Sequence, residues 1–275
     1  MRILLTGRNG QVGWELERAL PALGDVTATD RTGLNLENTD DLRRVVREVR
    51  PDLIVNAAAY TAVDKAESER ERAMQVNAVA PGLLAEEAKQ LGGLLVHYST
   101  DYVFEGEKRT PYTEDDAPNP ISHYARTKLE GERAIAATGC RHLILRTSWV
   151  YGPRAANFYQ IILRKAAAGE PMLMVDDQTS VPTPSVFVAE YTLALLRKKT
   201  TGLLHLVPSG EATRYEFARA VVQGCGSRST IEAARSESFP SPARRPRYSA
   251  MSNRAAAQIL GAPLLHWRDA LARLN

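Results

Sequence analysis

Short apolar runs alternate with longer amphipathic stretches through the first half of the chain. Such runs are typical of buried strands, and they lie at residues 3–6, 26–29, 53–55, 94–98 and 142–145. Helical patterns lie between them, near 12, after 38–41, over 69–91 with an interruption at Pro81, and over 122–137. Alternating strands and helices predict parallel strands joined by right-handed crossovers. We therefore expect an α/β fold with a doubly wound, Rossmann-like parallel sheet.

The second half of the chain is less regular and richer in proline. Its helical patterns lie near residues 157–168, 186–197, 214–222 and 252–259. We expect residues 1–147 to form a dinucleotide-binding domain, completed by a returning segment near 172–205. Residues 148–275 should form mainly a smaller α/β lobe that binds the substrate.

Composition narrows the class of protein. Of the 275 residues, 44% are hydrophobic and 24% are charged, and a net charge of +3 gives no reason to expect nucleic-acid or membrane binding. No apolar run reaches the length of a membrane span, and the apolar stretch at the N-terminus is too short for a signal peptide. Cys140 and Cys225 show neither a CxxC nor a metal-ligand spacing. We expect a cytoplasmic protein with reduced thiols.

Three glycines directly follow the first predicted strand. Gly7, Gly10 and Gly13 form a GxxGxxG turn that leads into a helix. Glycine permits a tight turn and lets the backbone approach a pyrophosphate, which binds at the N-terminus of the helix. A purely structural corner is the alternative. A strand directly before the turn and a helix directly after it favour nucleotide binding.

The ends of the second and third strands carry further cofactor signals. Asp30 is placed to accept hydrogen bonds from an adenosine ribose, which favours NAD, whereas Arg31 could pair with a 2′-phosphate, which favours NADP. The choice between NADH and NADPH therefore stays open. The small residues of 56–61 let a flat ligand lie against the backbone, although helix packing would explain the alanines equally well.

Candidate catalytic groups follow the fourth strand. Ser99 and Thr100 end that strand, at the sheet edge where open α/β sheets bind ligands. Tyr124 and Lys128 share one face of the next helix, and a nearby cation lowers the pKa of a phenol. The spacing alone is common, but with the upstream signals it predicts general acid catalysis. Thr100 would hydrogen-bond a substrate carbonyl, and Tyr124 would protonate its oxygen as hydride reaches the carbon.

Longer segments resemble one family over essentially the whole chain. They are GRNGQVGW at 7–14, NAAAYTAVDKAE at 56–67, HYSTDYVF at 97–104, RTSWVY at 146–151, DQ at 177–178 before PT at 182–183, and PARRP at 242–246. In these segments the chain resembles the dTDP-4-dehydrorhamnose reductase family of extended short-chain dehydrogenases/reductases. The resemblance implies NAD(P)H-dependent reduction of the 4-keto group of dTDP-4-dehydro-6-deoxy-L-mannose to dTDP-L-rhamnose, the last step of dTDP-rhamnose biosynthesis.

The motifs and the resemblance together assign roles to individual residues. The catalytic residues would be Thr100, Tyr124 and Lys128. The cofactor would be bound by Gly7, Gly10, Gln11, Val12, Gly13, Asp30, Arg31, Asn35, Leu36, Ala58, Ala59, Tyr60, Thr61, Tyr124 and Lys128. The substrate would be bound by Thr100, Asp101, Trp149, Arg244 and Arg245. Asn35 stands where the family often has Asp, so the resemblance says less about adenine contacts there.

Two parts of the substrate prediction have simpler alternatives. Arg244 and Arg245 are candidates for the sugar-nucleotide diphosphate because Arg pairs with phosphate oxygens in bidentate geometry, but a solvated basic loop would look the same. Trp149 could stack on the sugar or simply fill a core. Some relatives form metal-assisted dimers through acidic residues. Glu15 would suit such a role, but the remaining acids have no match, so we expect no metal and leave a homodimer open.

Other functions also stay open. A nucleotide-sugar 4-epimerase or 4,6-dehydratase would share most of these motifs, but a dehydratase needs an extra acid–base pair and Tyr102, not Glu, follows Asp101. A non-catalytic, NADP-binding regulatory subunit typically has damaged catalytic residues. This chain retains Thr100, Tyr124 and Lys128.

Overall fold

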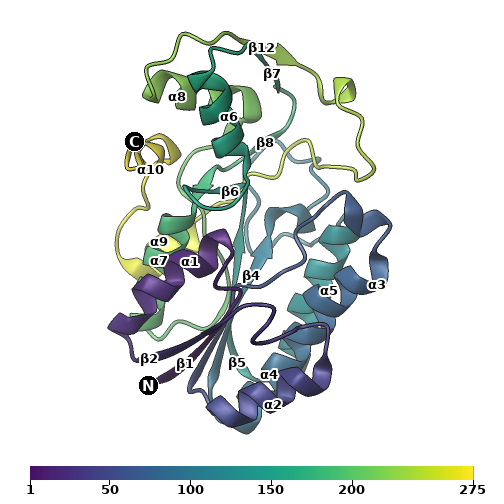
Figure 1. Cartoon of the computed structure of the whole chain (residues 1–275), viewed down its shortest axis with the longest axis vertical. Coiled ribbons are helices and arrows are strands. Elements are labelled where there is room, and N and C mark those ends of the chain that lie inside the picture. The colour runs from purple at the N-terminus through teal and green to yellow at the C-terminus, as the bar shows by residue number, and fades with distance from the viewer. Residues whose placement is uncertain (275) are drawn as a thin grey trace.

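A computed structural model describes residues 1–274 (Figure 1). Its centre is a six-stranded sheet of order β10-β5-β4-β3-β1-β2, in which every neighbouring pair is parallel. The strands are β1 (Arg2–Thr6), β2 (Asp25–Thr29), β3 (Leu53–Asn56), β4 (Leu94–Thr100), β5 (Arg141–Thr147) and β10 (Gly202–His205). The predicted α/β class with a doubly wound parallel sheet is confirmed.

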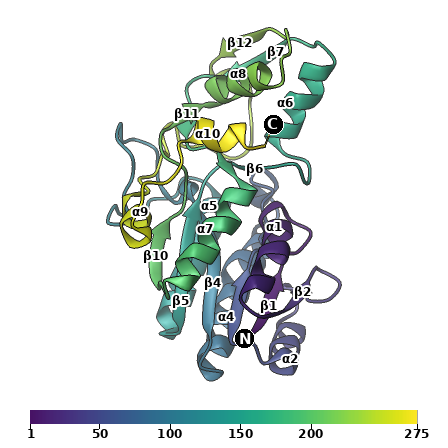
Figure 2. The ribbon, with the colours of Figure 1, turned by 90° about the vertical axis from the view of Figure 1, so that its left-hand side faces the viewer.

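Helices cover both faces of this sheet (Figures 1 and 2). One layer contains α1 (Gln11–Ala19), α7 (Ser185–Arg197) and α9 (Arg254–Leu260), and the other contains α2 (Thr39–Val49), α4 (Ala80–Gln90) and α5 (His123–Thr138). Because both faces are covered, the central strands are mostly apolar, and β3 and most of β1 and β4 are buried. The short apolar runs of the sequence therefore predicted these strands correctly.

The sheet reverses its order beside β1, whose two neighbours are β2 and β3. The chain leaves β1 toward one edge of the sheet and returns at β3 on the other side. Loops that leave the two strands in opposite directions open a crevice at their carboxyl ends, where ligands of such sheets bind.

The helical stretch predicted over 69–91 is continuous where an interruption at Pro81 was expected. It runs from α3 (Arg70–Met74) through a π-helical turn (Gln75–Val79) into α4. Pro81 lies in the first turn of α4, where a missing N–H costs least. Asn77 lies buried in this π turn, where its side-chain oxygen accepts from the backbone N of Tyr60 and its amide nitrogen donates to the Tyr60 carbonyl and the Thr127 hydroxyl.

The second half of the chain builds a small lobe with its own apolar core (Figure 1, top). The lobe contains β6 (Val150–Tyr151), α6 (Phe158–Ala167), β7 (Met172–Val175), β8 (Thr179–Ser180), β9 (Thr183–Pro184), β11 (Ala212–Thr213), α8 (Arg214–Gly224), β12 (Ile231–Ala234) and α10 (Trp267–Ala272). α7, β10 and α9 pack with the large sheet, whereas β7 pairs with β12 inside the small lobe. No helix within residues 1–274 is long and apolar enough to cross a membrane.

Candidate active site

A cavity of about 740 Å³ follows the carboxyl ends of the central strands, at the point where the sheet order reverses. It reaches from the turn after β1 to the first residue of α8. Most of the predicted site residues line it: Gly7, Gly10, Gln11, Val12, Asp30, Arg31, Asn35, Leu36, Ala58, Ala59, Tyr60, Thr61, Thr100, Asp101, Tyr124, Lys128 and Trp149. Residues far apart in sequence thus form one elongated site.

The glycine turn is shaped by close backbone approaches. Gly7 has φ +75°, and a Cβ there would lie 2.7 Å from the amide nitrogen of Ala58. A Cβ on Gly13 would lie 2.0 Å from the carbonyl oxygen of Gly7, so Gly13 packs α1 onto the turn and does not line the cavity. Gly10 is the N-cap residue of α1, and no side chain within residues 1–274 caps this end of the helix. The first amides of α1 therefore remain available to an anion such as a pyrophosphate.

Gln11 ties the turn to the small lobe. Its amide nitrogen donates to the carbonyl of Val150 at 3.2 Å, and its oxygen accepts from the Asn157 side chain at 2.9 Å. Asn157 also caps α6 by accepting from the amide of Gln160. The glycine turn at one end of the cavity is thereby connected to the small lobe, which forms the other end.

Asp30 is engaged by its own loop. One carboxylate oxygen accepts from the amide and hydroxyl of Thr32, at 2.9 and 2.6 Å, and from the amide of Gly33 at 3.2 Å. The other accepts from Asn9 at 3.1 Å. The Thr32 hydroxyl bond, followed by the backbone bonds, lowers the pKa of Asp30 to about 2. Asp30 is thus anionic and presents one lightly used oxygen to the cavity.

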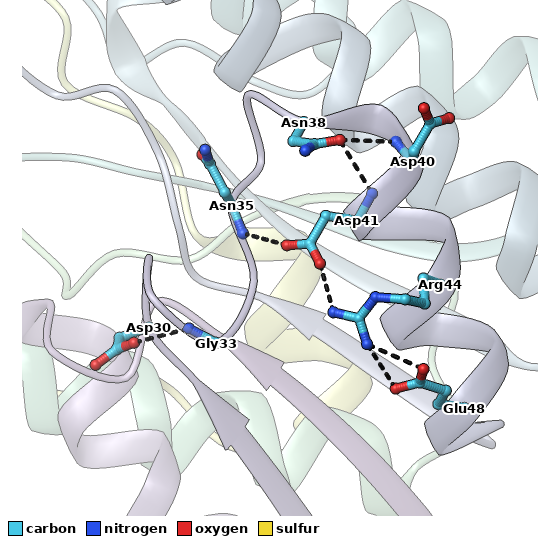
Figure 3. A network of polar contacts seen from close by, with 8 residues as sticks. All are labelled: Asp30, Gly33, Asn35, Asn38, Asp40, Asp41, Arg44 and Glu48. Atoms are coloured by element: carbon cyan, nitrogen blue, oxygen red, sulfur yellow. Dashed lines mark hydrogen bonds and ion pairs between the residues drawn. The ribbon is translucent and has the colours of Figure 1, made fainter.

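The loop beyond Asp30 is held by the start of α2 (Figure 3). Asn38 caps this helix by accepting from the amides of Asp40 and Asp41, both at 3.1 Å. The Asp41 carboxylate accepts from the backbone N of Asn35 at 3.2 Å and from Arg44 at 2.5 Å. Asn35 is therefore fixed through its backbone, and its identity as Asn rather than Asp leaves this network intact.

Two arginines converge on one carboxylate at this end of the cavity. Glu37 accepts from Arg31 at 2.7 Å and from Arg72 at 3.1 Å, and all three residues line the cavity. Arg72 also pairs with Glu69 at 3.0 Å, so two carboxylates balance the two guanidinium groups, and Arg31, which is 65% exposed, could exchange Glu37 for another anion. This arrangement suits an additional phosphate on the adenosine ribose.

Thr100, Asp101, Tyr124 and Lys128 lie together at the other end of the cavity. Tyr124 starts α5, which is capped by Ser122, and it forms a hydrogen bond with Thr100. Burial, together with the nearby Asp101 and Tyr102, raises the pKa of Tyr124. We expected the opposite shift, caused by Lys128. The ammonium is engaged elsewhere, with the carbonyl oxygen of Tyr98 at 2.6 Å and Nε2 of His97 at 3.1 Å.

Two further shifts come from burial in the same region. Burial lowers the pKa of Lys128 to about 8, opposed by Glu132 one turn along α5. Burial also raises the pKa of Asp101 to about 6, although its carboxylate accepts from the hydroxyls of Ser180 at 2.8 Å and Ser249 at 2.5 Å. Near neutral pH the site therefore combines a protonated phenol, an ammonium and a buried carboxylate.

Thr147 and Arg214 line the cavity but had no assigned role in the sequence prediction, and Ser99 was named only as a hydroxyl at the end of its strand. The hydroxyls of Ser99 and Thr147 are buried and have no hydrogen-bond partner among residues 1–274, although both residues line the cavity. Arg214 lies with its guanidinium 4.3 Å from the ring centroid of Trp149 and 5.1 Å from that of Phe158. Thr147 ends β5, two residues beyond the strand predicted at 142–145, and a hydroxyl residue so close to a predicted strand end is a usable signal. Nothing in the sequence places Arg214, because its position depends on how the small lobe packs.

The predicted arginine pair lies outside the cavity lining. Arg245 donates to both carboxylate oxygens of Asp64, at 3.1 and 2.8 Å, and Arg244 is exposed. Asp64 lies in the loop after β3, two residues before the buried Ala66. The loop 241–246 is therefore fastened beside the cavity, and a diphosphate role for its arginines stays a prediction.

The unpaired hydroxyls and the backbone cradle fit a dinucleotide. The glycine turn can take its pyrophosphate, the Asp30 loop its adenosine, and Ser99 and Thr147 offer free hydroxyls near the catalytic end. No three His, Cys, Asp or Glu side chains within residues 1–274 are grouped to hold a metal ion.

Comparison with known proteins gives a consistent result. A family described as the RmlD substrate binding domain matches residues 1–275. The chain is 42% identical to a dTDP-4-dehydrorhamnose reductase of Burkholderia thailandensis, covering 98% of this chain and 97% of that protein. It is 40% identical to the Escherichia coli K12 protein of the same name, covering 100% and 97%. A crystal structure of dTDP-4-dehydrorhamnose reductase from Bacillus anthracis in complex with NADP superposes with a TM-score of 0.95 at 31% identity, covering 99% and 98%.

Proposed function

This chain belongs to the dTDP-4-dehydrorhamnose reductase family, and from that premise we propose how its cavity carries out the reaction. The reaction is the NAD(P)H-dependent reduction of the 4-keto group of dTDP-4-dehydro-6-deoxy-L-mannose, which gives dTDP-L-rhamnose in the last step of its synthesis. The observation that carries the proposal is the position of Thr100, Tyr124 and Lys128 at one end of a cavity whose other end is a glycine turn.

The cofactor supplies the hydride that reduces C4 of the sugar. The backbone around Gly7 and Gly10 holds its pyrophosphate, and Asp30 accepts from the adenosine ribose. The Arg31 and Arg72 pair gives room for a 2′-phosphate, so both NADH and NADPH are accepted, with NADPH favoured.

Tyr124 donates the proton that the new alkoxide oxygen requires. Because its pKa is raised, the phenol still carries its proton at neutral pH, which is the state needed in the direction of reduction. Thr100 already hydrogen-bonds Tyr124, so a carbonyl oxygen between the two hydroxyls would accept from both. Lys128 lines the same cavity, and its ammonium would donate to the nicotinamide ribose.

The substrate occupies the end of the cavity formed by the small lobe. Asp101 accepts from sugar hydroxyls, and Trp149 covers one face of the sugar. Arg244 and Arg245 are assigned to the diphosphate, which requires the loop 241–246 to move toward the cavity or Arg245 to exchange Asp64 for phosphate.

The expected cellular setting follows from the same chemistry. Cys140 and Cys225 are both free thiols, as befits a reducing compartment, and both the reductant and the nucleotide sugar are cytoplasmic metabolites. We assign the enzyme to the cytoplasm, with the dTDP-sugar as its partner, and a homodimer as the state to test by light scattering.

A direct assay tests the function. Purified protein is mixed with NADPH or NADH and the dTDP-4-keto-6-deoxyhexose, and nicotinamide absorbance is followed. Oxidation that depends on the sugar is expected, with one product per NAD(P)H consumed. Sugar turnover without net consumption of the reductant would point to an epimerase, and no oxidation with either cofactor would refute the assignment.

A further inference from the structure

A buried row of polar side chains crosses the central sheet directly behind Lys128. Thr6 on β1, Asn56 on β3 and His97 on β4 are cross-strand neighbours in register, and each is no more than 1% exposed. The Thr6 hydroxyl lies 2.7 Å from the Asn56 amide oxygen, and the Asn56 amide nitrogen lies 3.1 Å from Nδ1 of His97. His97 Nε2 lies 3.1 Å from the Lys128 ammonium, so the row ends on a catalytic residue.

The chemistry of this row requires a neutral imidazole. An ammonium only donates hydrogen bonds, so Nε2 of His97 must accept from Lys128 while Lys128 is charged. Burial, and then the neighbouring Lys128, hold the pKa of His97 well below its ordinary value, which keeps the ring neutral. The hydrogen of the ring then sits on Nδ1. A half-turn of the Asn56 amide places its oxygen opposite that hydrogen and its N–H opposite the Thr6 oxygen, so His97 and Asn56 both have partners of the right kind.

Lys128 depends on this neutral acceptor because it lacks a carboxylate of its own. No ion pair within residues 1–274 includes Lys128, and Glu132, the nearest acid on α5, binds Arg146 of β5 through both oxygens at 2.9 and 2.6 Å. Asp101 and Tyr102 face Tyr124 from the turn after β4. His97 and the carbonyl of Tyr98 therefore take two of the three ammonium hydrogens.

We propose that His97, oriented by Asn56 and Thr6, is a positioning residue that fixes the Lys128 ammonium so that its third N–H points into the cavity, toward the nicotinamide ribose. The inference rests on the proposed function for the identity of that ligand. Lys128 lines the cavity, and with two hydrogens directed into the protein, tetrahedral geometry leaves the third directed outward. Without His97 the side chain would be free to rotate, and its charged form would lose a hydrogen bond.

The test compares His97→Leu with His97→Gln, because a glutamine amide can present an acceptor near the position of Nε2. The dissociation constant for NADPH is measured by fluorescence from pH 6 to 10 without any sugar. For His97→Leu we expect about tenfold weaker binding at pH 7, the scale of one charge-assisted hydrogen bond. The pH at which binding is lost should also fall, because a lost acceptor destabilises the ammonium. His97→Gln should stay within about threefold of the wild type on the same scale.

Thr192→Val is the matched control. Thr192 is fully buried in α7 and bonds the hydroxyl of Tyr98, whereas Lys128 is held by the backbone carbonyl of Tyr98 and not by that hydroxyl. It should lower the melting temperature without moving the pH profile. The proposal is overturned if His97→Leu binds NADPH like the wild type, or if the Leu and Gln variants are equally impaired. Because no sugar is present, either result is independent of whether the reductase assay succeeds.

Discussion

The two ends of the cavity are built in different ways. At the cofactor end the part that would take the pyrophosphate is backbone, formed by the glycine turn after β1, and the side chains beside it come from the loop after β2 and from α3. At the sugar end it is formed by side chains from the large sheet and the small lobe, such as Asp101, Trp149 and Arg214. A backbone surface needs glycine and little else, so it is visible in sequence. A surface made of side chains forms only when the two lobes meet correctly, so it is not visible in the sequence.

The largest effect on turnover should come from replacing Tyr124. Tyr124→Phe removes the proton donor, and we expect turnover to fall by about 10²- to 10⁴-fold, the range for general acid catalysis. NADPH affinity should stay within about twofold, since one hydroxyl contributes little to binding a whole dinucleotide. Both are measured by steady-state kinetics and a binding titration. Wild-type turnover in the variant would assign the proton to another group.

Adding one methyl group at Gly7 should disrupt the cofactor end of the cavity. Gly7→Ala adds a Cβ 2.7 Å from the amide of Ala58 at a positive φ, so we expect NADPH binding to weaken by more than about tenfold and the melting temperature to fall. Gly92→Ala is the control, because Gly92 also has a positive φ (+67°) but nothing lies within 4 Å of its Cβ. It should cost about 1 kcal/mol of stability and leave NADPH binding unchanged. Equal binding losses in both variants would contradict a specific role for the turn.

Asp101 gives the sugar end a pH signature. Its pKa of about 6 lies above the ~3.9 of an unfolded chain, so between these values the folded state holds a proton that the unfolded state releases. The stability contributed by this group is therefore present near pH 4 and lost as pH rises through 6, by up to about 3 kcal/mol. Asp101→Asn removes the effect.

Melting temperatures measure this difference. Asp101→Asn should melt above the wild type at pH 8, and the gap should narrow toward pH 4.5. Asp116→Asn is a control of opposite sign, because the Lys108 hydrogen bond lowers the pKa of Asp116 and an exposed pair contributes little. A gap for Asp101→Asn that is the same at every pH would show that Asp101 does not titrate in this range.

Replacing Arg214 tests the sugar end of the cavity through substrate binding alone. Arg214→Gln should raise the KM for the dTDP-sugar by about five- to tenfold, because a cation stacked on Trp149 suits the charged substrate, while kcat changes little. Arg219→Gln is the matched control on α8, exposed and outside the cavity lining. If both variants have the same KM, long-range charge rather than contact explains the effect.

The smallest effect should occur at the outer rim of the cofactor end. Arg31 is 65% exposed and shares Glu37 with Arg72, so Arg31→Ala should weaken NADPH binding by only about threefold. NADH binding should be unchanged, because NADH lacks the 2′-phosphate. Parallel titrations with both cofactors measure the ratio. Equal losses for NADPH and NADH would show that Arg31 acts on the loop and not on a phosphate.

Prediction from sequence succeeded where one short segment contains the whole feature. The parallel strands and the glycine turn that leads into α1 are of this kind, since each depends on local spacing, whereas the roles of the turn, Tyr124 and Lys128 stay predictions. It failed for the direction of the Tyr124 pKa shift, because the tyrosine is desolvated by its surroundings and Lys128 is engaged by His97. It also gave His97 no role, although a histidine within an otherwise apolar strand was a visible signal.

The sequence by itself determined the sheet, the crossover helices and the glycine turn after β1, because these follow from periodicity and from motifs a few residues long, and it carries the prediction that Tyr124 is the proton donor. Only the tertiary structure decided which charges are desolvated and which side chains from distant segments meet. The alignment of Thr6, Asn56 and His97 is an example, since it depends on the register of three strands that are far apart in sequence. The same holds for Arg214 over Trp149, which exists only because the small lobe folds back against the sheet.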